Sequence, residues 1–266
     1  MPLADPSVKA TLPQYTPTPI HEIPSIVDRA RSNFHEGRTR PISFRVAQLQ
    51  KLYYGLCDIE STAIAALSAD LGRAHFETFF ADIGFTKSEL LKAIKNLNTW
   101  LEDEYISAGI PWLFRLAHRT YLKKDPMGVV LVVGPWNYPW NLNLLPFIGA
   151  MAAGNTCILK PSEVAPYSAA VLEKLFEVSG IDTECYRIVQ GGVPETTELL
   201  KQQFDKIFYT GSTQVGKVVM RAAAEFLTPV VLELYAPPTS DVYLIMSFLV
   251  IANLTLFPTV VERTPL

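Results

Sequence analysis

Hydrophobic residues change their spacing partway along the chain. Between Ile20 and about Leu101, apolar residues recur three or four positions apart, with charged residues between them. The clearest run is Leu49, Leu52, Leu56, Ile59, Ala63 and Leu67, and a second is Phe76, Phe79, Phe80, Ile83, Leu90, Leu91, Ile94, Leu97 and Leu101. This spacing puts apolar side chains on one face of a helix, so it predicts a series of amphipathic helices. Gly109-Ile110-Pro111 is predicted to end the series.

After Tyr121 the apolar residues form short, continuous runs rich in Val and Ile. The predicted strands are 129–133, 156–159, 186–189, 207–209 and 230–234, and the predicted helices lie around 142–153, 168–178, 195–202 and 215–226. Strands that alternate with helices indicate βαβ units, and uninterrupted apolar strands fit a sheet covered on both faces. The pattern therefore predicts an α/β fold: a doubly wound, Rossmann-like parallel sheet with an N-terminal helical layer.

Four regions are expected along the chain. Five prolines within residues 1–19 favour an extended arm outside the core. Residues 20–110 are expected to form helices that pack on a Rossmann-like region at 111–234, followed by an apolar tail at 235–266. Within the tail, 242–257 is almost wholly apolar but shorter than the ~20 residues that span a bilayer. A buried segment is therefore favoured, with a membrane anchor as the alternative.

Composition excludes several functions. The net charge is -3 and the 23 basic residues are scattered, which argues against nucleic-acid binding. Three cysteines without CxxC spacing and four dispersed histidines form neither a disulfide framework nor a metal-ligand pattern. The N-terminus has no charged region followed by an apolar run, so no secretory signal is predicted. The expected location is the cytoplasm, with membrane association through the tail as the alternative.

A glycine-containing string follows the predicted strand 207–209. Gly211-Ser212-Thr213-Gln214-Val215-Gly216-Lys217 opens a predicted helix. Glycines at such a turn let backbone amides approach a phosphate, and the helix N-terminus adds its positive end. The string also fits the start of a P-loop, but Val218 stands where a Ser or Thr should reach magnesium, which argues against a nucleotide hydrolase. The alternative is that the glycines only let helix and sheet pack closely.

Two more strands end in polar motifs. Asn137, within Gly134-Pro135-Trp136-Asn137-Tyr138-Pro139, is placed to donate its amide to a substrate oxygen, or alternatively to cap the next helix. Lys160 and Glu163, three residues apart, can hold ribose hydroxyls, or alternatively form a surface ion pair. Because the carboxyl ends of parallel strands share one edge of the sheet, three polar loops there favour a ligand site.

These motifs together resemble a known family. Their order and spacing, completed by Leu232-Glu233-Leu234, are similar to those of the aldehyde dehydrogenase superfamily. The Trp-Asn-Tyr-Pro form resembles the class 3 branch, which oxidises fatty and aromatic aldehydes. The similarity runs from about Ile23 to Leu234.

The resemblance implies roles for individual residues. Lys160 and Glu163 would contact the adenosine ribose of NAD, and the pyrophosphate turn would comprise Gly211, Ser212 and Gly216. Trp136 belongs to the same implied cofactor site. The Glu163 carboxylate favours NAD because it repels a 2′-phosphate, with NADP as the alternative. Asn137 would form the side-chain half of an oxyanion hole, and Glu233 would be the general base.

The sequence departs from the family directly after Leu234. There the family continues with Gly-Gly-Lys and later a catalytic domain with a nucleophilic cysteine, whereas this sequence continues with Tyr235. Cys57, Cys157 and Cys185 fall at predicted packing positions, and none substitutes for that nucleophile. We therefore expect a truncated family member that does not oxidise its small-molecule aldehyde, without a metal and of undetermined oligomeric state. The alternative is a non-catalytic nucleotide-binding or interaction protein.

Overall fold

The computed structural model describes residues 11–106 and 121–235, and all structural statements refer to these residues. The first part is helical, as predicted. The 3-10 turn η1 (Ile20–Glu22) leads into α2 (Ile23–His35), α3 (Ile42–Asp58), α4 (Glu60–Leu71), α5 (His75–Glu77), the π-helical segment η2 (Thr78–Gly84) and α6 (Phe85–Trp100). The predicted end of this series at Gly109-Ile110-Pro111 lies outside the described residues.

The second part forms a parallel sheet flanked by helices. Its strands are β3 (Val129–Val133), β4 (Thr156–Lys160), β5 (Tyr186–Ile188), β6 (Lys206–Gly211) and β7 (Val230–Leu234). The helices between them are α8 (Asn141–Ala153), α9 (Pro166–Ser179), α10 (Val193–Leu200) and α11 (Thr213–Ala224). The strand order is β5-β4-β3-β6-β7, and every neighbouring pair is parallel. The predicted doubly wound α/β fold is confirmed.

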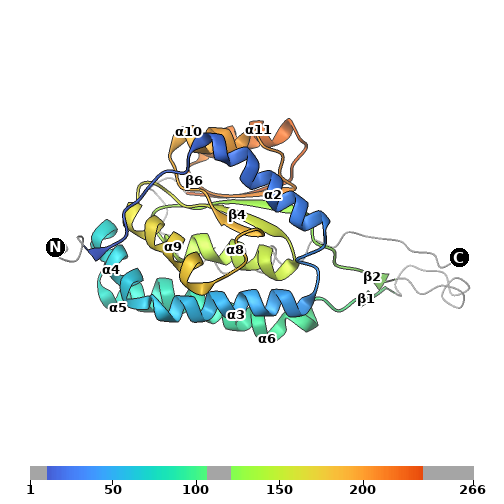
Figure 1. Ribbon diagram of the computed structural model, residues 1–266, viewed down its shortest axis with the longest axis horizontal. Coiled ribbons are helices and arrows are strands. Elements are labelled where there is room, and N and C mark those ends of the chain that lie inside the picture. Colours follow the sequence, from blue (N-terminus) through green and yellow to red (C-terminus); the bar gives the residue numbers. More distant parts are fainter. Residues whose placement is uncertain (1–10, 107–120, 236–266) are drawn as a thin grey trace, which may run out of the picture.

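The order of the strands reverses in the middle of the sheet. The chain moves outward from β3 to β4 and β5, and then returns to add β6 and β7 on the other side of β3. Figure 1 shows the sheet between α2 and the layer that contains α3 and α6. In sheets of this kind, ligands bind beyond the carboxyl ends of the strands where the order reverses, which here is between β3 and β6.

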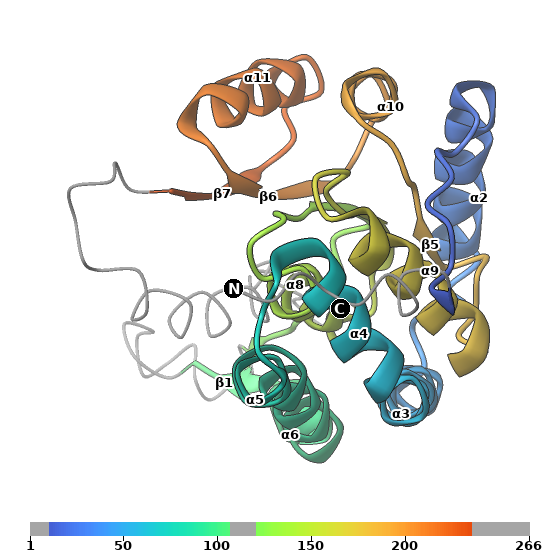
Figure 2. The same cartoon turned by 90° about the vertical axis from the view of Figure 1, so that its left-hand side faces the viewer.

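Helices cover both faces of the sheet. Figure 2 shows α8 and α9 on one face and α10 and α11 on the other. A further layer of α3, α4 and α6 packs on α8 and α9, whereas α2 packs against β3, β4 and α10 on the opposite face. The N-terminal helices therefore lie on both sides of the sheet. The spacing of apolar residues in the sequence did not predict which helix lies on which side.

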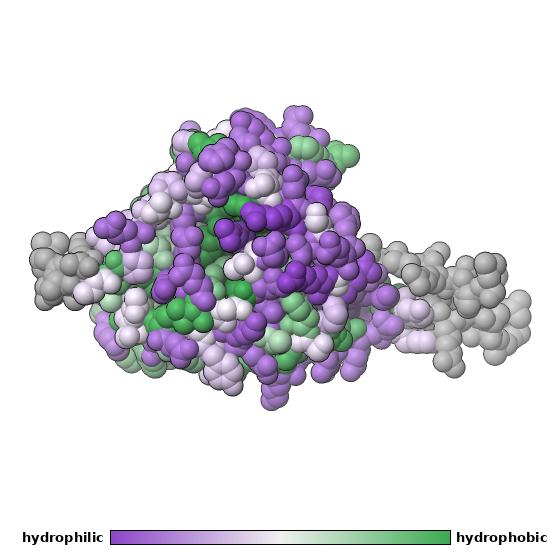
Figure 3. Space-filling model, in the orientation of Figure 1, coloured by the Kyte–Doolittle hydropathy of each residue, from purple (hydrophilic) through white to green (hydrophobic). Residues whose placement is uncertain are grey.

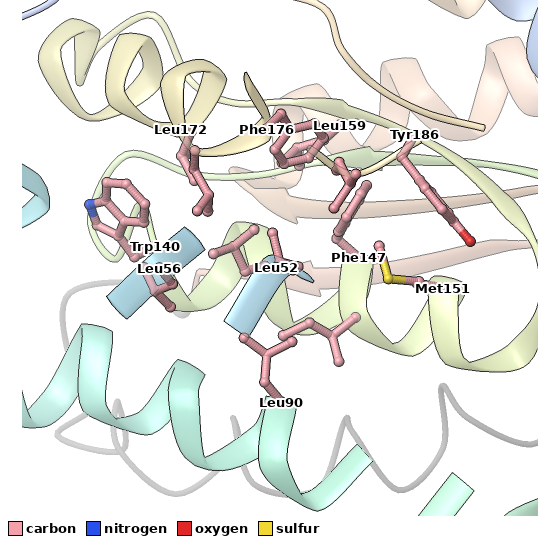
Figure 4. Packing of buried hydrophobic residues seen from close by; sticks show 14 of the residues in the cluster. Leu52, Leu56, Leu90, Trp140, Phe147, Met151, Leu159, Leu172, Phe176 and Tyr186 are labelled. Atoms are coloured by element: carbon pink, nitrogen blue, oxygen red, sulfur yellow. The ribbon is translucent and has the colours of Figure 1, made fainter. Parts of the chain in front are cut away.

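Two hydrophobic clusters correspond to the two faces. The larger includes Trp140, Phe147 and Tyr186, whose side chains are completely buried between the sheet and the α3–α6 layer (Figure 4). The ring of Phe147 lies 5.1 Å from that of Phe176 and 5.8 Å from that of Tyr186, measured between centroids. The smaller cluster joins α2 to the opposite face through Ile23 and its neighbours. The surface seen in Figure 3 is mostly hydrophilic, with hydrophobic residues in small separate groups.

Part of the proline-rich arm belongs to the core, which corrects the expectation of an arm outside it. Leu12 is only 7% exposed and packs in the larger cluster. Farther along, the Thr18 amide donates to the Gln190 carbonyl at 3.0 Å, and the Gln190 amide donates to Thr18 Oγ1 at 2.9 Å. These contacts fasten the arm to the segment that follows β5, which a proline count does not predict.

The second predicted apolar run is only partly buried. Leu90 and Leu97 are buried as expected, but Phe76 and Phe80 are 75% and 69% exposed, and Phe79 is exposed as well. The π-helical hydrogen bonding of η2 adds a residue to the turn, which rotates the residues before it relative to those after it. A regular helical period therefore could not place these phenylalanines.

A short antiparallel ribbon was also absent from the predicted elements. Strand β1 (Glu104–Tyr105) pairs with β2 (Tyr121–Leu122). Two-residue strands carry too little pattern to be recognised in a sequence.

The predicted location needs correction. Within residues 11–106 and 121–235, every helix is too short or too polar to cross a membrane. Residues 242–257, on which the membrane alternative depended, lie outside the described part of the chain.

A close helix crossing provides a test of the packing between α3 and α9. A Cβ atom on Gly55 would lie 2.5 Å from Ser179 Cβ and 2.9 Å from Ser179 Cα, so backbone would have to move. We expect Gly55→Ala to lower the free energy of unfolding by about 2 kcal/mol in urea titrations. The matched control is Gly180→Ala at the end of α9, where nothing lies within 4 Å but φ is +60°. That change should cost about 1 kcal/mol through backbone strain alone, and a larger cost than Gly55→Ala would contradict the packing argument.

Candidate functional site

The three polar loops identified in the sequence meet at one edge of the sheet. The loop 134–140 follows β3, Pro161 follows β4, and Ser212 follows β6. Because β3 is hydrogen-bonded to both β4 and β6, their carboxyl ends lie side by side. The structure thus assembles the predicted edge, at the point where the strand order reverses.

Lys160 and Glu163 form an ion pair at the end of β4. Lys160 Nζ lies 2.9 Å from Glu163 Oε2, and the two side chains are 5% and 41% exposed. The alternative of a surface ion pair therefore holds for Glu163 but not for Lys160, which is buried as the last residue of its strand. Burial raises the pKa of Glu163, but the hydrogen bond from Lys160, a backbone hydrogen bond and the charge of Lys160 together outweigh it, so the net pKa is below its usual value. The carboxylate is therefore ionised at neutral pH and can accept hydrogen bonds from hydroxyls.

Glycines at the start of α11 allow neighbouring groups to pack closely against the backbone. Gly211 ends β6, and a Cβ there would lie 2.3 Å from Tyr209 Oη. A Cβ on Gly216 would lie 2.9 Å from Leu234 Cδ2 on β7, so this glycine also serves the packing role that the sequence left open. Ser212 is the N-cap of α11, and its Oγ accepts from the Val215 amide at 3.3 Å.

Carboxylates from the N-terminal helices occupy the starts of α8 and α9. Asp82 Oδ1 accepts from the Asn141 amide at 2.6 Å. The Asp70 carboxylate accepts from the amides of Tyr167 and Ser168 at 3.1 and 2.7 Å. The cap residues of α8 and α9 themselves provide no side-chain hydrogen bond. Both helix N-termini are thus capped by a carboxyl group from another layer.

The remaining helices that begin at this edge differ from each other. At α10, Glu195 Oε2 accepts from the Gly192 amide at 2.8 Å, so a carboxylate again sits at the N-terminus. At α11 the cap is the neutral hydroxyl of Ser212, and its first turn contains no acidic residue. Among the helices described at this edge, α11 therefore keeps the positive end of its dipole available to an anion.

Asn137 does not cap the next helix, so that alternative is wrong. Helix α8 begins at Asn141, with Trp140 as its N-cap. Instead, Asn137 Oδ1 accepts from the Tyr235 hydroxyl at 3.2 Å. With its oxygen engaged, the side-chain amide has its NH₂ group as a donor for a developing negative oxygen.

Arg73 fixes the backbone that carries Asn137. Its guanidinium lies 3.2 Å from Asp82 Oδ2, donates to the Asn137 carbonyl at 2.5 Å, and stacks 4.3 Å above the ring of Tyr138. Asp82 is completely buried in η2. Sequence reasoning missed both residues, although an aspartate within an otherwise apolar run was a signal that something had to pair with it.

Glu233 lies on β7 opposite Thr210 of β6, whose Oγ1 is 3.5 Å from Glu233 Oε2. Burial raises the pKa of this carboxyl above its usual value, and the hydrogen bond from Thr210 opposes that effect. Tyr235, two residues on, joins this strand to Asn137 through its hydroxyl. Trp136, in the same loop as Asn137, is 44% exposed.

The cysteines lie elsewhere. Cys157 and Cys185 are buried, and burial raises the pKa of both thiols, that of Cys185 to about 12. Cys57 lies on α3 beside Lys87 of α6. The predicted packing roles agree with these positions.

Asp82 provides a pH test of the site's support. Burial raises its pKa from 3.8 to about 7, against the opposing effects of the Asn141 amide and Arg73. Since the folded pKa exceeds the unfolded one, the contribution to stability is complete below about pH 4 and is lost as the pH rises to about 7. Over that range we expect the free energy of unfolding to fall by on the order of 3 kcal/mol relative to Asp82→Asn. Urea unfolding of both proteins at several pH values measures this difference, and parallel curves would contradict it.

The fold and this edge define a doubly wound α/β protein with the layout of a dinucleotide-binding domain. A family model described as "Aldehyde dehydrogenase family" matches residues 1–237. The chain belongs to the aldehyde dehydrogenase family.

Similar proteins agree with this assignment. The mouse "Aldehyde dehydrogenase, dimeric NADP-preferring" is 45% identical over 212 residues, covering 80% of this chain and 46% of the relative. A "Beta-apo-4'-carotenal oxygenase" from Gibberella fujikuroi is 44% identical, covering 82% of this chain and 40% of the relative. The chain thus spans under half the length of these relatives. The class 3 resemblance seen in the motifs is confirmed by such relatives.

Solved structures show the same fold. The substrate-bound state of Staphylococcus aureus AldH is 39% identical with a TM-score of 0.76, covering 80% of this chain and 45% of that one. The NAD+ complex of aldehyde dehydrogenase from Bacillus cereus is 25% identical with a TM-score of 0.74, covering 86% and 53%.

Proposed function

We propose that this chain binds NAD(P) across the carboxyl edge of its sheet and carries this part of an aldehyde-oxidising site. The observation that carries the proposal is that the Lys160–Glu163 pair, at the end of β4, lies at the same edge of the sheet as the start of α11, with only β3 between β4 and β6. The N-terminus of α11 has a neutral cap. The pair suits ribose hydroxyls, and the helix N-terminus suits a pyrophosphate. Gly211, Ser212 and Gly216 form the turn that admits it.

NAD is the proposed cofactor, with NADP as the alternative. The ionised Glu163 would repel a 2′-phosphate, whereas the name of the mouse relative indicates preference for NADP in that protein. Trp136 is proposed to border the bound cofactor. The cofactor, when bound, supplies an acceptor for hydride from the substrate.

Two residues are proposed to act on the aldehyde. The Asn137 amide donates to the oxygen on which negative charge develops, and the Glu233 carboxylate accepts a proton. The assignment of Glu233 as the general base is supported by its partial burial, which raises the pKa of the carboxyl and so strengthens it as a proton acceptor. The aldehyde itself is a small molecule, as the family indicates.

The 266-residue polypeptide is proposed to bind cofactor without oxidising aldehydes, because the thiols of Cys157 and Cys185 are buried and that of Cys57 lies on α3. Calorimetric titration with NAD tests the binding. We expect saturable binding of one NAD per chain, and its absence from folded protein would reject the proposal. NADP titrated in parallel decides the preference, and magnesium-dependent ATP hydrolysis, which we do not expect, would point to a phosphate-transfer enzyme instead.

A further inference from the structure

Strand β7 ends the sheet and has a free edge among the described residues. The strand order places β6 on one side of β7, and no described strand lies on its other side. Figure 2 shows β7 at the outer end of the sheet, beneath α11. Its residues, Val-Val-Leu-Glu-Leu, include no proline or lysine, with which proteins commonly block pairing at an exposed edge. The outer edge of β7 is therefore open to pairing with a further strand.

The pairing with β6 shows which backbone groups of β7 point outward. At the two ends of the strand, the Ile207 amide donates to the Pro229 carbonyl and the Tyr235 amide donates to the Gly211 carbonyl, both at 3.0 Å. Successive residues of a strand point their backbone groups to alternate sides, so the odd-numbered residues here face β6 and the even-numbered ones face away. The outward residues are Val230, Leu232 and Leu234.

Both faces of β7 are apolar, yet neither is fully covered. Val231 packs against the larger hydrophobic cluster, whereas Val230 and Leu232 pack against the smaller one, and all three side chains are only partly buried. Leu234 is 39% exposed. The central strand β3, by contrast, is buried throughout. A neighbouring strand with apolar residues on both of its faces would extend both clusters, so the edge suits an uninterrupted apolar strand.

The sequence that follows β7 has the composition of such a strand. Residues 236–241 are Ala-Pro-Pro-Thr-Ser-Asp, which is rich in turn-forming residues. Residues 242–246 are Val-Tyr-Leu-Ile-Met, an uncharged run with high β-propensity. A short connection can join antiparallel strands, whereas a parallel neighbour needs a crossover of about a dozen residues or more. The length of 236–241 therefore suits a strand that turns back along β7.

We propose that residues 242–246 return antiparallel to β7 and pair with its outer edge through Val230, Leu232 and Leu234. The chain then adds a strand of its own to the five of the sheet. A segment joined to β7 by so short a connection has an effective concentration on the order of millimolar, so it pairs in preference to a second copy of the chain at lower protein concentrations. This pairing does not depend on cofactor binding.

Amide hydrogen exchange of the full chain, resolved by NMR, tests the pairing. The amides of Val230, Leu232 and Leu234 are expected to exchange on the order of 100-fold more slowly than in an unstructured peptide, because each is hydrogen-bonded to the added strand. The amides of Val231 and Glu233 face β6 and should be protected in either case. Fast exchange at the outward positions beside slow exchange at Val231 and Glu233 would reject the proposal.

A double variant, Leu244→Pro with Ile245→Pro, identifies the partner strand. It removes two adjacent amide donors, one of which faces β7 in any register. The outward amides of β7 should then exchange roughly tenfold faster or more, while those of Val231 and Glu233 remain protected. Unchanged protection of the outward amides would exclude residues 242–246 as the partner.

The matched control is Leu254→Pro with Thr255→Pro, which makes the same change in the apolar sequence beyond residues 242–246. It should leave the exchange of every β7 amide unchanged. Exchange is also measured at several protein concentrations. Protection of the outward amides that is independent of concentration supports pairing within one chain, whereas protection that increases with concentration would assign the edge to a second copy and reject the proposal.

Discussion

Purified 266-residue polypeptide mixed with NAD and decanal is expected to produce no NADH. Aldehyde oxidation in this family begins with a thiolate that attacks the aldehyde carbon, and without it hydride has no covalent adduct from which to leave. Cys157 and Cys185 are buried, and the pKa of each thiol is raised by burial, so neither forms a thiolate at neutral pH. Cys57 is partly accessible but lies on α3, in the layer beyond α8 and α9.

The measurement is absorbance in the NADH band after decanal is added to the NAD-saturated protein. Calorimetric NAD binding by the same preparation is the control, because it shows that a lack of turnover does not reflect unfolding. NADH formation that scales with protein concentration would overturn the prediction. In that event Cys57→Ser, the change at the most accessible thiol, would show whether Cys57 is the nucleophile.

Lys160→Met is expected to weaken NAD binding by roughly 10- to 100-fold, in line with the loss of a hydrogen bond from a charged group. The methionine fills a similar volume but has no donor for the ribose, and Glu163 loses the partner that holds its carboxylate in place. Calorimetric titration of NAD into both proteins measures the change.

Lys174→Met is the matched control. Lys174 pairs with Glu177 at 3.0 Å with the same spacing in a helix, but its side chain is 49% exposed and lies away from the sheet edge. Its replacement should leave NAD affinity unchanged. Equal affinities for Lys160→Met and the unaltered chain would place the ribose elsewhere.

The strands were predictable because they are buried on both faces. A run such as 129–133 contains only valine and leucine, and the observed β3 has the same bounds. Strand ends were less certain, since β4 continues to Lys160 and β6 begins at Lys206, two lysines that an apolar pattern excludes. The edge where the motifs meet follows from the parallel order alone, so the sequence was sufficient to predict it.

The hydrogen bonds that hold the site residues in place could not be predicted, because they join segments that are far apart in the sequence. The hydrogen bond between the Asn141 amide and Asp82 links residues 59 positions apart, and the bond between Tyr235 and Asn137 links residues 98 positions apart. No periodicity encodes such pairs. For the same reason the cap of α8 was sought nearby in the sequence, at Asn137, whereas the acceptor is Asp82.

The capping of α8 and α9 by residues from earlier elements has a consequence for folding during synthesis. Asp70 and Asp82 precede α8 and α9 in the chain, so during synthesis both leave the ribosome before the helices whose first amides they accept. The side chains of Asp70 and Asp82 are therefore present before the backbone amides that will donate to them. Domains are generally completed in the order in which they are translated. We therefore expect the later segment to dock on the earlier one as the protein folds.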